Sequence, residues 1–575
     1  MRGRWLAAPV AGLVLLLTGC STVPTSSPTI EITQAAAPTD TAVGVEPLGP
    51  QAGATPEEVV RGFIEASASV VRNHPVARQY LAGDAVDSWN DSDGVTVISE
   101  DYAAVQSQSG TVVVTGTTVG AVDEKGVFGV GTGSVYTRPF TLSDDSGEWR
   151  ITDPPDGLVL LEPDFARTYD RVNAYFLDPT GTRVVPDPRY VVSGEAQPNT
   201  LVTRLVEGAS PAIAAGVSNP LSGARLRSTV SVSGSTATVD LSWPTDVTDA
   251  VVAGASAQLA WSLEQPELGL QSVVVLRDGQ PLGLPDVPDR QTTDDWASLD
   301  PDAAPAGAVG HYVDAGGLRL ATDGSPAPGP AGAGIYGLTS AAISVDPDTA
   351  QLGLTVGVST SAATPGVALV AGPYGGDLAQ VLTGDSFTDP TTAGTRTEIW
   401  TVRNGSEVVR LPAGGSPQAV SATTLPGLGR ATQFQLSPDG VRAAVVVQGP
   451  EGGQLYVGTV VRDEEAVSVR DLRSVAPTIR QVIDVAWRNA GLLMLLAGDP
   501  GSGRTVPYTV GVDGWDLQTT NRSGLPGVPT ALAAAPQRQP LISANGQMWQ
   551  LAGGTWVTLV RGAEAQPGTA PFYPM

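Results

Sequence analysis

The hydrophobic pattern of this chain begins with one continuous apolar run and turns into short periodic segments only after residue 54. The run covers residues 6–17, and Arg2 and Arg4 stand ahead of it. It is too short to cross a bilayer as a helix, which takes about 20 residues. A basic start, a short apolar stretch and small residues behind it are typical of a signal peptide.

The residues Leu17-Thr18-Gly19-Cys20 close this run and resemble a bacterial lipobox. The resemblance implies cleavage after Gly19 and lipidation of Cys20, which would become the N-terminus of the mature chain. An ordinary secreted protein with one spare cysteine is the alternative. We expect a signal peptide over residues 1–19 and a mature protein held by its acyl chains on the extracytoplasmic face of the cell membrane.

Two segments without apolar periodicity divide the rest of the chain. Residues 20–54 are rich in Ser, Thr, Pro and Ala and contain no aromatic residue, which predicts a flexible tether. Residues 283–310 are acidic and rich in proline, which predicts a second linker. The periodic segments between and after these linkers define three further regions.

Residues 55–165 predict an α+β domain that starts with helix. Thr55-Pro56-Glu57-Glu58 has the residues of a capping box with proline in the first turn, and apolar residues follow at helical spacing. A second short helix is expected over 77–81. The alternating pattern then predicts strands over 95–98, 111–119, 126–130, 135–142 and 149–152. Helices followed by an antiparallel sheet resemble the NTF2-like cone fold, which can hold a ligand or act as a spacer.

Residues 170–282 predict a second α+β domain. Strands are expected over 172–177, 183–186 and 190–192, in a hairpin around Gly234, and over 273–276. Helices are expected over 201–208, capped by Asn199 or Thr200 and ended by Gly208, and over 251–263.

Four motifs of this second region resemble the GerMN domain of sporulation and germination proteins and of actinobacterial lipoproteins. In chain order they are Tyr-Phe-Leu at 175–177, Leu-Val-Glu-Gly-Ala-Ser-Pro at 205–211, Thr-Val-Asp-Leu-Ser at 238–242 and Val-Val-Val-Leu-Arg-Asp-Gly at 273–279. The resemblance implies a domain that binds partners at the cell envelope and carries no enzymatic activity.

Residues 311–575 repeat an apolar strand followed by a turn. Markers at Pro347, Pro390, Pro438, Arg488 and Gln537 are separated by 43, 48, 50 and 49 residues. Steps of about 40–50 residues filled with short strands predict a β-propeller. Five blades are clear, and a hairpin at 311–322 can supply a sixth.

The composition of the chain argues against several classes of protein. The chain has 32 basic and 58 acidic residues and a formal net charge of −26, which argues against binding to nucleic acid. Cys20 is the one cysteine, so no disulfide forms within the chain. The sequence has no second long apolar segment, so no membrane span is predicted.

Candidate catalytic and metal-binding motifs fail on their context. Asp91, Asp93, Gly94 and Glu100 match positions of a calcium loop, but Trp89 stands at its first position, so a turn is predicted. His74 is predicted to be a solvated loop histidine. Asp240 is expected to fix a strand end or the turn before Trp243-Pro244, and no histidine lies in its domain to activate Ser242.

The candidate motifs within residues 311–575 also lack the surroundings that their chemistry requires. Residues 332–337 fit the letters of a dinucleotide loop but lead into a strand, with no βαβ unit around them. Residues 501–503 are predicted to form a hairpin turn, and His311 is isolated from other metal-ligating residues. We therefore expect no catalytic residue, cofactor or metal, and the sequence names no partner-binding residues.

The order of lipobox, tether, α+β domain, GerMN-like domain and propeller resembles the LpqB family of actinobacterial lipoproteins over nearly the whole chain. The resemblance implies a non-catalytic accessory protein that contacts the extracellular domain of a sensor histidine kinase, MtrB, and so acts in cell-wall homeostasis and division. Two alternatives stay open. One is a scaffold that binds envelope glycan or lipid, and the other is an envelope hydrolase that relies on paired carboxylates, since only two histidines exist.

Overall fold

The computed structural model describes residues 47–305, 307–361, 366–463 and 466–575. The predicted signal peptide, Cys20 and most of the predicted tether lie outside these ranges. Among the described residues, no helix is both long and apolar enough to span a membrane.

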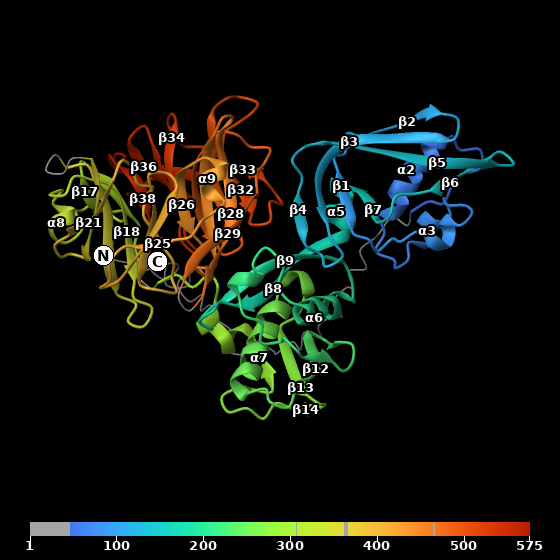
Figure 1. Ribbon diagram of the computed structural model, residues 1–575, viewed down its shortest axis with the longest axis horizontal. Helices are drawn as coiled ribbons and strands as arrows, with labels where there is room; N and C mark the ends of the chain where they lie inside the picture. Colours follow the sequence, from blue (N-terminus) through green and yellow to red (C-terminus); the bar gives the residue numbers. More distant parts are fainter. Residues whose placement is uncertain (1–46, 306, 362–365, 464–465) are drawn as a thin grey trace, which may run out of the picture. The chain divides into compact units, whose positions relative to one another are not determined.

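The N-terminal domain packs short helices against one sheet (Figure 1). Its helices are α2 (Pro56–Ser67), α3 (Pro75–Arg78) and α4 (Ala85–Ser88). The predicted capping box is confirmed: Thr55 Oγ1 accepts from Glu58 N at 3.3 Å, and the Glu58 carboxylate accepts from Thr55 N at 2.8 Å. The second predicted helix begins earlier than expected, because Pro75 occupies its first turn.

The sheet of this domain has seven strands, two of which the sequence did not predict (β2 and β7). They are β1 (Val95–Ile98), β2 (Ala103–Gln108), β3 (Thr111–Val122), β4 (Phe128–Val130), β5 (Val135–Asp145), β6 (Glu148–Asp153) and β7 (Leu158–Leu161). The long β3 pairs with β2 and β5 along its first half and with β1 and β4 along its second. The expectation of a wholly antiparallel sheet is wrong, since β7 joins the edge opposite β6 and runs parallel to β1.

The second domain contains two sheets. Strands β8 (Tyr169–Leu177) and β9 (Val184–Val192) form a two-stranded antiparallel sheet by themselves, after α5 (Glu162–Thr168). The second sheet holds β10 (Arg225–Leu226), β11 (Ser231–Ser233), β12 (Thr236–Ser242), β13 (Ser272–Arg277), β14 (Gln280–Pro281) and β15 (Arg290–Gln291). The predicted breaks in β9 are absent: the strand is continuous and buried up to its last residue.

Two helices cover the core of the second domain. Helix α7 (Asp249–Leu263) is the crossover between the parallel strands β12 and β13. Helix α6 (Gln197–Glu207) begins before the predicted cap, because Pro198 suits its first turn and the Asn199 side chain instead accepts from Val230 N at 3.1 Å. Gly208, with φ of 111°, ends the helix as predicted. Short 3-10 turns η1 (Ala214–Gly216) and η2 (Pro266–Leu268) complete the domain.

The predicted linker over residues 283–310 is attached to the domains on both of its sides. Strand β15 pairs with β13, and η3 (Thr293–Leu299) follows it. The Asp302 carboxylate accepts from Ala490 N of the propeller at 2.7 Å, and Arg538 donates to the Pro305 carbonyl at 2.8 Å.

The C-terminal region is a six-bladed propeller, and five of its blades are four-stranded antiparallel sheets. Blade 1 has β18 (Leu338–Val345), β19 (Leu352–Ser359), β20 (Val367–Pro373) and β21 (Ala379–Gly384). Blade 2 has β22 (Thr391–Thr392), β23 (Glu398–Arg403), β24 (Glu407–Pro412) and β25 (Gln418–Val420). Blade 3 has β26 (Arg430–Leu436), β27 (Arg442–Gly449), β28 (Gly452–Arg462) and β29 (Val467–Ser474). Blade 4 has β30 (Val482–Asn489), β31 (Leu492–Gly498), β32 (Thr505–Gly511) and β33 (Gln518–Thr519). Blade 5 has β34 (Pro529–Ala533), β35 (Leu541–Ala544), β36 (Gln547–Ala552) and β37 (Thr555–Thr558). Short helices α8 (Gly329–Gly332) and α9 (Leu425–Leu428) lie before blade 1 and before β26.

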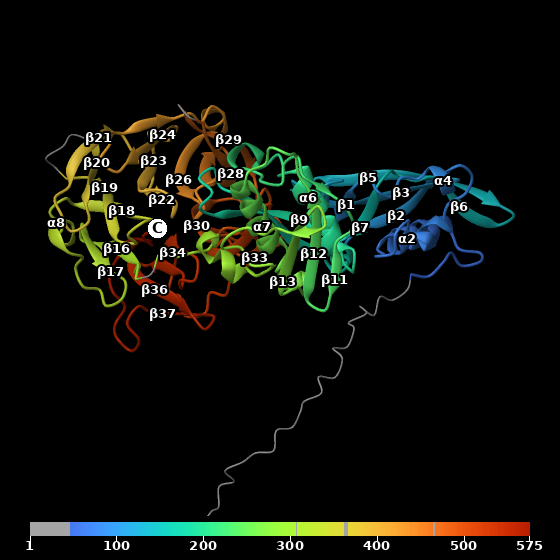
Figure 2. The ribbon, with the colours of Figure 1, turned by 90° about the horizontal axis from the view of Figure 1, so that it is seen from below.

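The sixth blade joins the two ends of the propeller sequence. The predicted hairpin, β16 (His311–Asp314) and β17 (Gly317–Leu320), takes its inner strand from β38 (Thr569–Phe572) near the C-terminus. Met575 then exchanges backbone hydrogen bonds with β18 of blade 1, and the C-terminus lies near the middle of the ring (Figure 2). This pairing closes the ring, so no blade of the propeller is left without a neighbour.

Residues of all three domains meet at one junction. Trp515, which follows β32, packs its ring against Phe128 of the first domain at 5.1 Å and Tyr190 of the second at 5.9 Å. Asp513 accepts from the Tyr190 hydroxyl at 3.0 Å and from Arg171 Nε at 3.3 Å. The propeller is therefore bound to both preceding domains by apolar and charged contacts together.

Candidate functional site in the propeller channel

Polar side chains on or next to the inner strands of four blades lie around the centre of the propeller. Strands β18, β26, β30 and β34 each have a bulge or irregularity in register near their start, and Ser340, Gln433, Asp484 and Ala531 follow these irregularities. Blade 2 contributes Asp389, just before β22. A bulge turns the next side chain away from the regular strand alternation. The same local irregularity thus occurs in blades 1, 3, 4 and 5, where it places Ser340, Asp484 and Ala531 at the channel and Gln433 against Asp389.

Asp389 links three neighbouring blades. It is hydrogen-bonded to the Ser340 side chain of blade 1 and accepts from Gln433 Nε2 of blade 3 at 3.4 Å. Burial raises the pKa of Asp389, and these two hydrogen bonds oppose the rise. The Gln433 Oε1 atom is buried without a hydrogen-bond partner among the described residues.

Asp484 links blade 4 to blade 5. Its oxygens accept from Val485 N at 2.8 Å and from Leu532 N at 2.7 Å, and the residue is 4% exposed. Burial raises the pKa of Asp484 well above its ordinary value, and the negative charge of Asp389 adds to the rise, which the two backbone donors oppose. Two carboxyl groups that repel one another in a buried site favour the protonated form of at least one of them.

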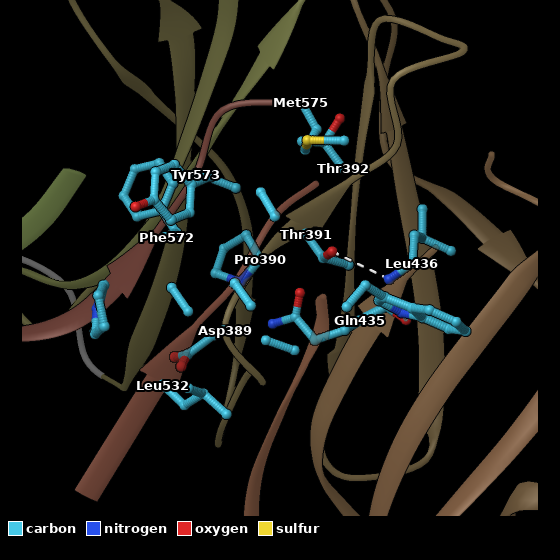
Figure 3. A pocket seen from close by; sticks show the side chains of 18 of the residues that line it. Asp389, Pro390, Thr391, Thr392, Gln435, Leu436, Leu532, Phe572, Tyr573 and Met575 are labelled. Carbon is cyan, nitrogen blue, oxygen red and sulfur yellow. Dashed lines mark hydrogen bonds between the residues drawn. The ribbon is translucent and has the colours of Figure 1, made fainter. Parts of the chain in front are cut away.

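The cavity around these carboxyl groups is small. Figure 3 shows side chains of the inner strands and of the C-terminal segment projecting toward it, with Leu436 N donating to the Thr391 hydroxyl at 3.2 Å. Its volume is about 70 Å³, room for a few water molecules and well below the roughly 300–1,000 Å³ of typical small-molecule sites. None of the described residues lining it is Lys, Arg or His. The channel can therefore hold water or a proton between carboxyl groups, and it offers no histidine to activate a nucleophile.

The prediction that His74 is a solvated loop residue is wrong. Its side chain is 11% exposed, and Nδ1 lies 2.8 Å from Asp91, which Arg78 also approaches at 3.5 Å. Residues 91–94 form the predicted turn ahead of β1. His74 and Asp91 thus tie the loop before α3 to that turn, and the described residues contain no group of three or more His, Cys, Asp or Glu that could hold a metal ion.

His311 belongs to the closure of the propeller. It is fully buried at the start of β16, with Nδ1 2.9 Å from the Val309 carbonyl and Nε2 3.0 Å from the Tyr374 hydroxyl, and it stacks on Phe572 of β38. Burial lowers the pKa of His311 to about 4. The imidazole is therefore neutral at pH 7 and acts as a packed, hydrogen-bonded core residue.

Asp240 and Ser242 have structural contacts. Asp240 accepts from Gly279 N at 2.9 Å and from Arg227 at 3.3 Å, so it fixes the turn after β13, whereas the predicted turn lies before Trp243. The Ser242 hydroxyl donates to the Arg225 carbonyl at 3.5 Å. Residues 332–337 run from the end of α8 into β18 as predicted, and residues 501–503 form the turn between β31 and β32.

Sequence reasoning missed the channel carboxyl groups and the domain junction. The available signal for the first was an aspartate inside an otherwise apolar strand, as in Val-Ile-Asp-Val at 482–485. The sequence offers less to predict the domain junction from. Arg442 and Trp515 contact residues that are far away in the chain, so no local pattern marks these contacts.

Three family models match the chain in the order of its domains. The model described as "Lipoprotein LpqB, N-terminal domain" matches residues 49–166, "Sporulation and spore germination" matches 173–283, and "Lipoprotein LpqB beta-propeller domain" matches 318–574. The fold thus defines a multidomain protein that joins a GerMN domain to a β-propeller, as the sequence predicted.

Relatives with the same organisation identify the family. Lipoprotein LpqB of Rhodococcus opacus is 32% identical over 489 residues, which cover 80% of this chain and 79% of the relative. Lipoprotein LpqB of Thermobifida fusca is 28% identical and covers 99% of this chain and 98% of the relative. The chain belongs to the LpqB lipoprotein family, whose members are named as lipoproteins. In a solved nidogen/laminin complex, the matched chain is 7% identical, and the match covers 47% of this chain and 99% of that chain with a TM-score of 0.35.

Proposed function

We propose that this protein is anchored to the extracytoplasmic face of the cell membrane by lipid on Cys20, and that its folded domains are a non-catalytic partner of the extracellular domain of an MtrB-like sensor histidine kinase. Through this contact it would modulate envelope signalling, cell-wall homeostasis and division. Membership of a lipoprotein family supports the anchor, and the resemblance of the whole chain to that family supports the partner.

The observation that carries the binding role is the junction of the three domains. Trp515 and Asp513 of the propeller contact Phe128 of the first domain and Tyr190 and Arg171 of the second. Domains fixed in this way present one continuous surface, and a preorganised surface loses less conformational entropy on binding than linked, independent domains do.

The anchor would strengthen such a contact without adding any new interaction. Lipid on Cys20 confines the folded domains to a layer beside the membrane, which raises their effective concentration for a membrane-embedded kinase. A contact that is weak between free domains can then be occupied in the cell.

Photo-crosslinking in living cells tests this function. A photoreactive residue is placed at exposed apolar positions of each domain: Val105 and Val135 in the first, Val232 in the second and Val528 in the propeller. We expect crosslinks to the sensor kinase only from those positions that lie near one another on the protein surface. Crosslinks to wall polymer alone would support the scaffold alternative, and no crosslink to the kinase from any position would contradict the proposal.

The second candidate function is a carboxylate-dependent envelope hydrolase. The two buried carboxyl groups, Asp389 and Asp484, favour it, whereas the cavity volume of about 70 Å³ opposes it, because a glycan needs a larger site. Paired carboxyl groups can act as acid and base in glycoside hydrolysis when one is protonated and the other is ionised. Turnover of peptidoglycan or arabinogalactan fragments that Asp484→Asn abolishes would support it. Equal absence of turnover in the wild-type chain and the variant would remove it.

A further inference from the structure

A second cavity lies where the three domains meet, outside the propeller channel. It has a volume of about 540 Å³, within the range of about 300–1,000 Å³ that small ligands occupy. Phe128 of the first domain, Asp187 and Ser210 of the second, and Arg442, Arg473 and Asp513 of the propeller line it. A molecule bound here would touch every folded domain of the chain.

The arginines of this cavity have unused hydrogen-bond donors. Arg442 is 1% exposed, and one of its terminal nitrogens donates to the Pro186 carbonyl. Its Nε and Nη1 have no hydrogen-bond partner among the described residues. Asp439 Oδ2, which also has none there, forms an ion pair with Nη1 at 3.8 Å, a distance too long for a hydrogen bond. Arg473 makes one long hydrogen bond of 3.4 Å to the Ala212 carbonyl.

The acceptors of the cavity are largely engaged by the protein itself. Asp187 accepts from the backbone and the hydroxyl of Ser210, both at 2.7 Å, and pairs with Arg189 at 2.8 Å. Asp513 accepts from Tyr190 and Arg171. Asp123 accepts from two backbone N–H groups of its own turn, and Asp471 is exposed to solvent, where water screens its charge.

The cavity therefore has free guanidinium donors but few free acceptors, which indicates the charge of its ligand. A guanidinium group that is buried without its full set of acceptors is costly, and a bound anion supplies acceptors and opposite charge together. The positive charge of Arg442 also acts on Arg473: burial lowers the pKa of Arg473 to about 10, and Arg442 adds to this effect, which the carboxylates of Asp187, Asp513 and Asp471 oppose. Two guanidinium groups that repel one another are brought into balance by a ligand that carries negative charge.

We propose that the cavity between the three domains binds a phosphate group, which Arg442 and Arg473 hold from the propeller side. Phosphate matches the planar donor set of arginine better than a single-atom anion does, because it accepts two parallel hydrogen bonds from one guanidinium. The group can be free phosphate or the phosphate of an ester, since both present the same oxygen atoms to the arginines.

Titration calorimetry tests the site on the full-length chain in maltoside micelles and phosphate-free buffer. Inorganic phosphate and glycerol 3-phosphate are the two probes. We expect saturable binding of at least one of them, and the one bound more tightly identifies the source of the group. The variant Arg473→Gln should weaken that binding about 10- to 100-fold, because it removes a charge-assisted hydrogen bond.

The matched control is Arg470→Gln on the same strand. Arg470 is half-exposed, pairs with Asp463 at 3.2 Å and does not line the cavity, so its replacement should leave phosphate affinity unchanged. Arg442→Gln should also lose binding, and its near-UV circular dichroism shows whether the junction still folds. Absence of saturable binding of both probes, or equal affinity in Arg473→Gln and the wild type, would overturn the proposal.

Discussion

Replacing Trp515 by alanine should release the N-terminal domain from the propeller without unfolding either. Trp515 lies on the propeller, but its ring packs into the core of the first domain. Its centroid is 5.1 Å from the rings of Phe128 and Phe165 and 5.9 Å from that of Tyr190. All three contacts are edge-to-face, the geometry that aromatic pairs favour.

The size of the effect follows from these contacts and from the partial exposure of the ring. A fully buried tryptophan costs about 3–5 kcal/mol on truncation to alanine, and edge-to-face contacts contribute about 0.5–1.5 kcal/mol each. Because Trp515 is half-buried, we expect a loss of ~3 kcal/mol in the free energy that joins the two domains. This loss lowers the equilibrium constant for domain docking about 100-fold.

Differential scanning calorimetry measures this coupling. In the wild type, the first domain and the propeller should unfold in one transition, and in Trp515→Ala the first domain should unfold separately at lower temperature. Trp549→Ala is the matched control, since Trp549 is also half-buried but lies within blade 5. It should lower the unfolding temperature without separating the transitions. An unsplit transition in Trp515→Ala, or the same splitting in the control, would refute the role of the junction.

Three further predictions address the ring, its buried histidine and the anchor. Deleting residues 569–575 removes β38 and should destabilise the propeller by several kcal/mol, because β16 loses its inner partner; an unchanged midpoint in thermal unfolding followed by near-UV circular dichroism would contradict this. With a pKa of about 4 in the folded chain, His311 gives stability that is complete above about pH 6.5 and lost as pH falls toward 4. Urea unfolding between these pH values should show that His311→Gln removes ~3 kcal/mol of this pH dependence, and an offset from the wild type that is the same at every pH would argue against it. Cys20→Ala should move the protein from the membrane pellet to the soluble fraction with its circular dichroism spectrum unchanged; continued sedimentation with membranes would show another attachment.

Local chemistry explains which elements the sequence predicted well. Thr55 and Glu58 form their capping box within one helical turn, so the signal and the structure involve the same few residues. Gly208 ends α6 for an equally local reason, its positive φ. The spacing of the blades was visible because each blade repeats the same turn after its inner strand. Pro390 is an exception: it precedes β22 rather than ending the inner strand of blade 2.

Elements that depend on distant contacts could not be predicted in this way. The alternation of β2 is weak, since Gln106, Ser107 and Gln108 are exposed at the sheet edge. The role of β38 depends on pairing with β16, more than 250 residues earlier in the chain. For the same reason, Asp389 and Asp484 meet only once the ring has formed, and Arg442 reaches Pro186 only once the domains have docked.

The most direct test of the proposed function is a calorimetric titration with the purified extracellular domain of the sensor kinase from the same organism. The protein titrated into it is residues 21–575, the mature chain without its lipidated cysteine. Saturable binding is predicted, and Trp515→Ala should weaken it, because the released domains no longer present one fixed surface. The cytoplasmic domain of the kinase serves as the control and should produce no binding. Absence of saturable binding to a folded extracellular domain would contradict the function proposed for this protein.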